Sequence, residues 1–333
     1  MIPGLPAMLS PPATAKRVYL QEVVTRDGFQ SLDRFVPTDA KISLLNELGL
    51  AGLAKIEVTS FVSPQAIPNL RDADDVMVGI TRQPGVEYTV LVPNLRGAER
   101  ALPLRPDELN LVMSASETHN LMNLRMTRQQ SLQQLAEIVR FAAASRVAIN
   151  ISLSTSFGCP VEGRVEPDTV LGFIARFRDL GVRGITMADT TGMANPAQVE
   201  QLTARALALA PETQLTMHFH NTRGMGLANV CASLNAGADR FDASLGGLGG
   251  CPYAPGATGN ICTEDTAHML QLMGYQTGVD LARVIHAARR LPEITGAATP
   301  GQLAKAGTIY DLHPAPAGLA ELRERAVARM AAR

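Results

Sequence analysis

Short apolar runs of β-branched and aromatic residues alternate with longer stretches of helical period along most of the chain. Each apolar run ends in glycine, proline or polar residues, which is typical of strands that stop at a turn. The pattern predicts eight β-strands, at residues 18–24, 55–61, 86–93, 108–114, 148–156, 184–188, 215–220 and 240–245.

A plausible helical stretch follows each of these strands. Helices are predicted at residues 38–48, 127–144, 167–180, 196–209, 225–236 and 264–273, with glycines near several of their ends. Alternation of strand and helix indicates parallel strands, and eight such units predict an α/β fold of the (β/α)8 TIM-barrel type. A doubly wound open sheet is the competing interpretation, but no GxGxxG motif follows the first strand.

The eight units set the expected domain boundaries. We expect residues 1–17 to be a disordered N-terminal segment and residues 18–281 to form the barrel. Residues 282–333 are too few for another ordinary domain, so we expect a short C-terminal helical extension there.

Composition excludes several classes of protein. Charged residues make up only 18% of the 333 residues, below the roughly 25% of typical soluble domains, which indicates extensive buried surface and fits a homodimer. The net charge of −1 argues against a nucleic-acid or membrane partner, and no apolar run reaches the roughly 20 residues of a membrane span. The start of the chain does not have the pattern of a signal peptide, and four scattered cysteines do not make a disulfide scaffold. We therefore expect a reduced, cytoplasmic protein.

Barrel enzymes build their sites where the strands end, so these positions carry the candidate chemistry. The first strand runs into Arg26 and Asp27. A carboxylate offers a hard metal ligand, and a guanidinium can hold a developing oxyanion. The alternative is an ordinary surface ion pair before a glycine turn.

The seventh strand carries His218 and His220 on either side of Phe219. Side chains alternate along a strand, so both imidazoles share one face and Phe219 points to the other. An inward pair of histidines at a strand end predicts half of a metal site, whereas a lone histidine would more often be a core residue.

Six glycines between positions 246 and 260 follow the eighth strand. Such a segment can approach a ligand or move over one. Cys251 lies in this segment, and an exposed thiol there favours a catalytic role over an inert loop. Asn260 follows and could add a carbonyl oxygen to a metal.

Two acids complete the set of candidates. Glu57 lies in an otherwise apolar strand, where a carboxylate is costly unless paired, and Arg26 on the neighbouring strand is the expected partner. Asp189 ends the sixth strand, where a turn or helix-capping role is an equal alternative to a functional one.

Together these residues resemble the HMG-CoA lyases, within the wider DRE-TIM group of metal-dependent barrel lyases. The resemblance extends from about Val18 to Ala306 and is most specific in the Gly-Gly-Cys-Pro-Tyr stretch at 249–253. Its other motifs are Arg26-Asp27-Gly28, residues 57–64 (EVTSFVSP), 93–97 (PNLRG), 158–160 (GCP), 189–192 (DTTG) and 218–220 (HFH).

The resemblance implies a residue-by-residue set of roles. A divalent metal, Mg²⁺ or Mn²⁺ with Zn²⁺ as an alternative, would be held by Asp27, His218, His220 and Asn260. The implied catalytic residues are Arg26, Asp27, Glu57, Asp189, His218 and Cys251. Arg26 would stabilise an enolate oxygen, and Cys251 would act from its loop. An acyl-CoA thioester would be the substrate, contacted by Arg26, Gln30, Ser60 and Arg96.

The implied reaction is the retro-Claisen cleavage of 3-hydroxy-3-methylglutaryl-CoA to acetyl-CoA and acetoacetate. The pattern departs from the family at Ser31-Leu32, where lyases of this type have Asn-Glu, and at 295–302, which carries no basic residue. These departures keep open a lyase for another branched 3-hydroxyacyl-CoA or an aldolase for a hydroxy keto acid. The remaining alternative is a barrel that binds metal or CoA without turnover.

Overall fold

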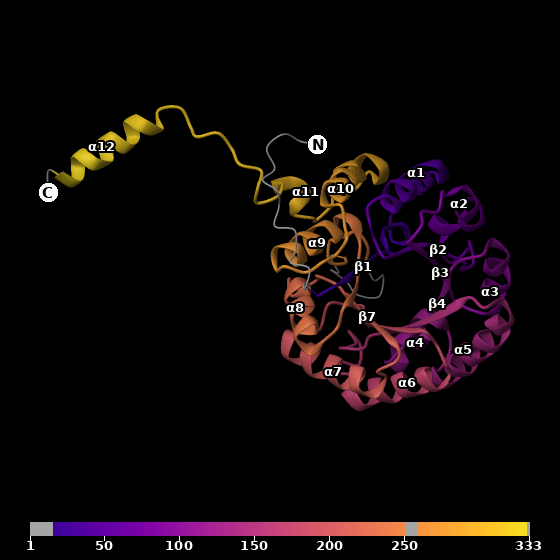
Figure 1. Ribbon diagram of the computed structural model, residues 1–333. Coiled ribbons are helices and arrows are strands. Elements are labelled where there is room, and N and C mark those ends of the chain that lie inside the picture. Colours follow the sequence, from indigo (N-terminus) through magenta and orange to yellow (C-terminus); the bar gives the residue numbers. More distant parts are fainter. Residues whose placement is uncertain (1–15, 251–258, 332–333) are drawn as a thin grey trace.

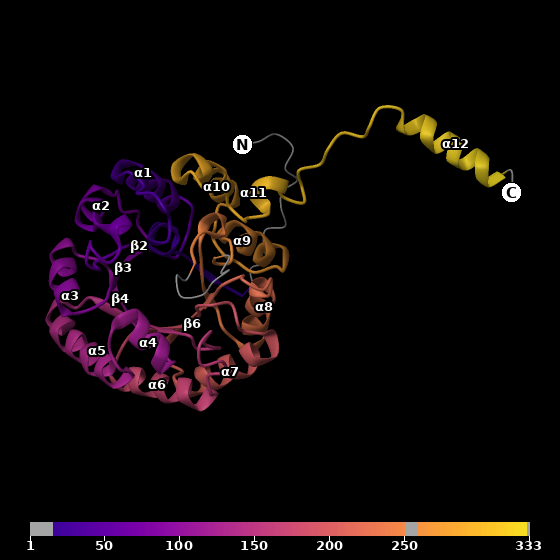
Figure 2. The same cartoon turned by 180° about the vertical axis from the view of Figure 1, so that it is seen from behind.

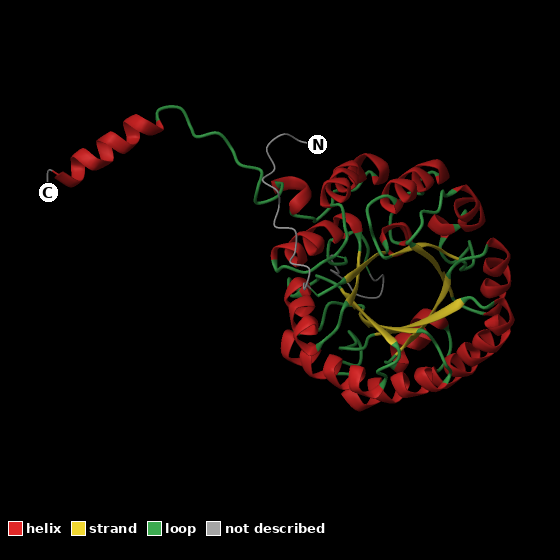
Figure 3. Cartoon of the chain, viewed as in Figure 1, coloured by secondary structure: helices red, strands yellow, loops and turns green. Residues whose placement is uncertain are grey.

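Eight parallel strands close into one barrel in chain order, so that β8 pairs with both β7 and β1 (Figure 3). The structure, a computed structural model, describes residues 16–250 and 259–331. Closure confirms the predicted (β/α)8 barrel, because an open doubly wound sheet would leave two edge strands. The strands are β1 (Tyr19–Glu22), β2 (Lys55–Ser60), β3 (Glu87–Val92), β4 (Glu108–Ser114), β5 (Ala148–Ser154), β6 (Gly184–Asp189), β7 (Gln214–Phe219) and β8 (Arg240–Ala243).

Helices form a ring around this barrel (Figure 1). The α-helices of the described residues are α1 (Thr38–Gly49), α2 (Ala73–Gly79), α3 (Leu95–Ala101), α4 (Glu117–Leu124), α5 (Arg128–Ala142), α6 (Pro167–Asp179), α7 (Pro196–Leu209), α8 (Gly226–Ala236), α9 (Thr263–Leu272), α10 (Leu281–Thr295), α11 (Leu303–Ala306) and α12 (Leu319–Ala331), of which α12 lies outside the ring. Local chemistry sets their ends. For example, α5 begins at a capping box of Thr127 and Gln130, and α8 ends at Gly237 in the left-handed region, which favours glycine.

The two faces of the barrel wall differ in polarity. On β4, Leu109, Leu111 and Met113 are fully buried in the hydrophobic core that lies between strands and helices. The alternate positions, beginning with Glu108 and Asn110, point into the barrel, where they line a polar cavity of about 10 Å³. The interior of this barrel is therefore polar, unlike the branched apolar layers usual in the fold.

The last part of the chain has two different environments. The helix α10 buries Val284, Ala288 and Leu291 and packs beside α1 and α9, so it belongs to the ring of helices. By contrast, α12 has no buried residue and stands away from the barrel (Figures 1 and 2). In the part of the chain that the structure describes, no helix is long and apolar enough to cross a membrane.

Candidate active site and metal centre

A single π-helical turn, η1 (Val24–Gly28), follows β1 and carries Arg26 and Asp27. Gly28 ends the turn, and a Cβ atom there would lie only 3.0 Å from the Val24 side chain. The turn thus packs closely and holds Arg26 and Asp27, which are almost fully buried, at the carboxyl end of β1.

Side chains from η1, from β7 and from the residue directly after β7 form a candidate metal centre. One ligand atom from each of Asp27, His218 and His220 lies within 4.8 Å of the other two, and all three residues are buried. The Nε2 atoms of the two histidines are 3.1 Å apart, and Asp27 Oδ2 is 3.8 Å from His220 Nε2. Phe219 points to the opposite face and packs against Phe157, with ring centroids 5.9 Å apart. Strand alternation therefore places both imidazoles inside, as predicted.

Asn260 joins this cluster from beyond the glycine-rich segment. It forms an isolated antiparallel bridge with His220, and its Nδ2 donates to Asp27 Oδ2 at 2.6 Å. Its Oδ1 is buried and has no hydrogen-bond partner among the described residues. One carboxylate, two imidazoles and an unsatisfied amide oxygen are a donor set that fits a divalent cation.

The protonation states also fit a cation. Burial alone would raise the pKa of Asp27, but Arg26, the two histidines and Asn260 lower it to about 2. Burial and the neighbouring His218 lower the pKa of His220 to about 4. At neutral pH the cluster therefore offers a carboxylate and a neutral His220 imidazole, the forms that bind metal.

Arg26 is fixed between two carboxylates. Its Nε donates to Glu57 Oε2, and its Nη1 donates to Asp27 Oδ1 at 2.7 Å. The predicted pairing of Arg26 with Glu57 is confirmed. Burial raises the pKa of Glu57, while the charge of Arg26 lowers it and limits the rise. The guanidinium is thus oriented before any substrate arrives.

Asp189 at the end of β6 has two unequal oxygens. Its Oδ1 accepts hydrogen bonds from the backbone N–H groups of Met193 and Ala194, which confirms the turn role that the sequence left open. Its Oδ2 is buried without a hydrogen-bond partner among the described residues. Burial raises its pKa to about 6 although both N–H groups lower it. This carboxylate can therefore gain or lose a proton near neutral pH.

The remaining predicted residues lie in different surroundings. Gln30 Nε2 donates to Asp27 Oδ1 at 3.0 Å, so Gln30 contacts the cluster. Ser60 is buried, and its Oγ accepts from Val62 N–H. Arg96 is exposed on α3, and no contact found in the described part of the chain links it to the cluster. Cys251 lies outside the described residues, so its place in the site remains a prediction.

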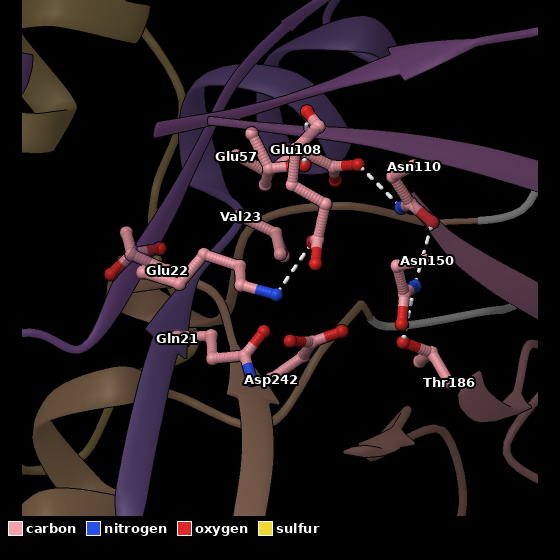
Figure 4. A pocket seen from close by; sticks show the side chains of 11 residues that line it. Gln21, Glu22, Val23, Glu57, Glu108, Asn110, Asn150, Thr186 and Asp242 are labelled. Atoms are coloured by element: carbon pink, nitrogen blue, oxygen red, sulfur yellow. Dashed lines mark hydrogen bonds and ion pairs between the residues drawn. The ribbon is translucent and has the colours of Figure 1, made fainter. Parts of the chain in front are cut away.

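Two site residues were not foreseen from the sequence. Asp242 on β8 lies 3.5 Å from His218 Nδ1, and this contact raises the pKa of His218 although burial lowers it. Asn110 on β4 donates to Glu57 Oε1 at 2.7 Å (Figure 4). The alternation of β4, in which Glu108 and Asn110 share one face between leucines, was a usable signal for a polar barrel interior.

Fold and site together define a (β/α)8 barrel with a candidate divalent-metal centre at the carboxyl ends of its strands. The HMGL-like family model matches residues 17–291, and the chain belongs to this family. The resemblance to HMG-CoA lyases stated from the motifs is thereby confirmed.

Curated relatives and solved structures agree with this family. The hydroxymethylglutaryl-CoA lyase YngG of Bacillus subtilis is 44% identical over 86% of this chain and 96% of its own length. The structure of an HMG-CoA lyase from Acinetobacter baumannii, in complex with coenzyme A and 3-methylmalate, is 52% identical with a TM-score of 0.87. It covers 90% of this chain and 98% of that one. A hydroxymethylglutaryl-CoA lyase from Pseudomonas aeruginosa is 36% identical with a TM-score of 0.85, covering 88% and 97%.

Proposed function

We propose that this chain is a carbon–carbon lyase that cleaves 3-hydroxy-3-methylglutaryl-CoA to acetyl-CoA and acetoacetate with the help of a divalent cation. The observation that carries the proposal is the contact between the candidate metal centre and the Arg26 guanidinium. Asp27 belongs to the candidate metal centre and also accepts a hydrogen bond from Arg26, so a cation ligand and an oxyanion partner lie side by side. Membership of a family whose relatives are named HMG-CoA lyases gives the substrate class.

The cation would be held by Asp27, His218, His220 and Asn260. When bound, a divalent cation would acidify the C3 hydroxyl of the substrate and hold it beside a neighbouring oxygen. Mixed oxygen and nitrogen ligands favour Mg²⁺ or Mn²⁺ and leave Zn²⁺ as an alternative.

The protein's own groups would handle the protons and the developing charge. Asp189 has a pKa raised to about 6, and its Oδ2 has no hydrogen-bond partner among the described residues, so this oxygen suits the acceptance of the C3 hydroxyl proton. Arg26 would pair with the thioester enolate oxygen that forms as the C2–C3 bond breaks. His218, oriented by Asp242, is the further catalytic candidate. By family resemblance, Cys251 would return a proton to the enolate carbon.

The substrate contacts proposed for Gln30, Ser60 and Arg96 have unequal support. Gln30 touches the cluster through Asp27, whereas the assignments of Ser60 and Arg96 rest on the family motif alone. The departure at Ser31-Leu32 was expected to shift acyl specificity. However, Leu32 packs against the hydrophobic core, and Ser31 Oγ donates a hydrogen bond to Gly28 O. The contacts of both residues in the structure are therefore with the protein itself. A homodimer in the cytoplasm remains part of the proposal.

A substrate panel tests this function. Metal-free protein is mixed with 3-hydroxy-3-methylglutaryl-CoA or with longer 3-hydroxyacyl-CoA thioesters, and acetyl-CoA is measured with and without Mg²⁺ or Mn²⁺. We expect acetyl-CoA and acetoacetate in equal amounts from the first substrate, only when metal is present. Faster release from a longer thioester would support the alternative lyase. Release from none would leave a binding protein without turnover.

A further inference from the structure

A chain of amide hydrogen bonds crosses the barrel interior beneath the Arg26–Glu57 pair. It joins Thr186 on β6, Asn150 on β5, Asn110 on β4 and Glu57 on β2, as the dashed lines in Figure 4 show. Each of these side chains is at most 8% exposed, and they line the polar cavity in the barrel. Packing alone does not require such a layer, because barrel interiors are usually filled with branched apolar side chains.

The donors of this chain have a fixed direction. Asn150 Nδ2 donates to Asn110 Oδ1 at 2.9 Å, and Ser152 Oγ donates to the same oxygen at 2.9 Å. With its oxygen accepting both hydrogen bonds, Asn110 must turn its NH₂ group toward Glu57, which it meets at 2.7 Å. The reversed amide would set its NH₂ group against the NH₂ group of Asn150 and its oxygen against the Glu57 carboxylate. The chain therefore ends on the carboxylate in a single orientation.

Glu57 contacts both Asn110 and Arg26, so the orientation of the Asn110 amide affects that of the Arg26 guanidinium. Asn110 occupies Oε1 of the carboxylate, and Arg26 Nε occupies Oε2. Without a donor at Oε1, the buried carboxylate would lose one of its two side-chain hydrogen bonds and would be freer to rotate away from the guanidinium. Among the described residues, the other hydrogen bond of the Arg26 side chain goes to Asp27, on the same turn, so Glu57 is its link to the barrel interior.

We propose that Asn110 is a positioning residue for the lyase reaction, and that it acts through Glu57 to hold the Arg26 guanidinium in the orientation that receives an enolate oxygen. The proposal rests on the proposed function for the identity of the oxyanion. According to this proposal, a residue inside the barrel contributes to catalysis together with the residues at the carboxyl ends of the strands.

A double-mutant cycle tests this role. Asn110→Ala is measured in the wild-type and Glu57→Gln backgrounds, with Thr89→Ala as a matched truncation. Thr89 lines the same cavity, but among the described residues its hydroxyl bonds to the Glu108 carbonyl and not to Glu57. We expect Asn110→Ala to lower kcat by about 10- to 100-fold in the wild-type background, with KM within about threefold. In the Glu57→Gln background, Asn110→Ala should lower kcat by less than about threefold. Thr89→Ala should also lower kcat by less than about threefold in either background. Equal losses from Asn110→Ala in both backgrounds would overturn the proposal.

A spectroscopic readout separates this inference from the proposed function. The Arg26 Nε–H resonance, identified as the arginine signal lost in Arg26→Lys, should move upfield in Asn110→Ala and stay in place in Thr89→Ala. An unmoved resonance in Asn110→Ala overturns the inference. If the wild-type protein releases no acetyl-CoA, the proposed function fails and this resonance alone decides the inference. Asn110→Ser, which keeps a hydroxyl for the donors on β5, replaces Asn110→Ala if that variant does not fold.

Discussion

Asp27 shows how much a single side chain contributes to this site. Its Oδ1 accepts from Arg26 and Gln30, and its Oδ2 accepts from Asn260 and lies near His220. The low pKa of about 2 that results keeps the carboxylate charged at all physiological pH values. One residue thus links the candidate metal centre to the oxyanion partner.

Arg26 gives the sharpest residue-level prediction. Arg26→Met should lower kcat by at least about 100-fold, because it removes a charge that acts on the transition state more than on the bound substrate. KM for 3-hydroxy-3-methylglutaryl-CoA should change little by steady-state kinetics. Near-normal turnover would return Arg26 to the role of an ordinary ion-pair partner.

Glu264 gives a prediction about pH. This carboxyl is fully buried, and burial raises its pKa to about 8 although the Gly246 N–H lowers it. The folded protein therefore holds the proton more tightly than the unfolded chain, and the associated stability is lost as pH rises from about 4.5 to 8. Glu264→Gln, which keeps an oxygen for Gly246, should raise Tm at pH 8.5 by at least about 2 °C and change it little at pH 5. An identical fall of Tm with pH in both proteins, measured by calorimetry, would refute this reasoning.

At the scale of elements, the strands were predicted well and the short helices were not. All eight predicted strands overlap the observed ones, because β-branched runs buried on the helix side are readable in the sequence. A helix was expected after each strand, but no bounds were predicted for α2, α3 and α4, since seven or eight residues are too few to show a helical period.

The candidate site could also be predicted only in part. His218 and His220 could be placed together because they lie two residues apart at the end of one strand, His220 directly after its last residue. Asn110 and Asp242 could not, because their partners lie on other strands and the contacts depend on the register of the sheet and on the curvature that turns β4 toward β2.

The glycine-rich segment gives a prediction at this scale. A Cβ atom on Gly249 would lie 2.4 Å from Asn260 Nδ2 and 3.1 Å from Asp27 Oδ2, at a φ of +119°. Gly249→Ala should therefore weaken Mn²⁺ binding at least about tenfold by displacing two of the proposed ligands. Gly274→Ala is the matched control, because Gly274 also has positive φ but open space around its Cβ position. Equal Mn²⁺ affinity in the two variants would show that Gly249 does not shape the cluster.

The whole molecule divides into a packed barrel and an unpacked end. No residue of α12 is buried, whereas Leu303 of α11 still packs against the barrel. A chain that ends at Gly307 should therefore keep its Tm within about 2 °C of the full-length value. A fall of more than about 5 °C, or a change of oligomeric state in sedimentation, would show that residues beyond Gly307 form a stabilising contact.

The central claim is that a divalent cation binds where η1 and β7 meet. Calorimetric titration of metal-free protein with Mn²⁺ tests it most directly, in the wild type and in His220→Ala with the folded barrel verified by circular dichroism. The account predicts one binding site per chain in the wild type and none in His220→Ala. Unchanged Mn²⁺ binding in His220→Ala would contradict it.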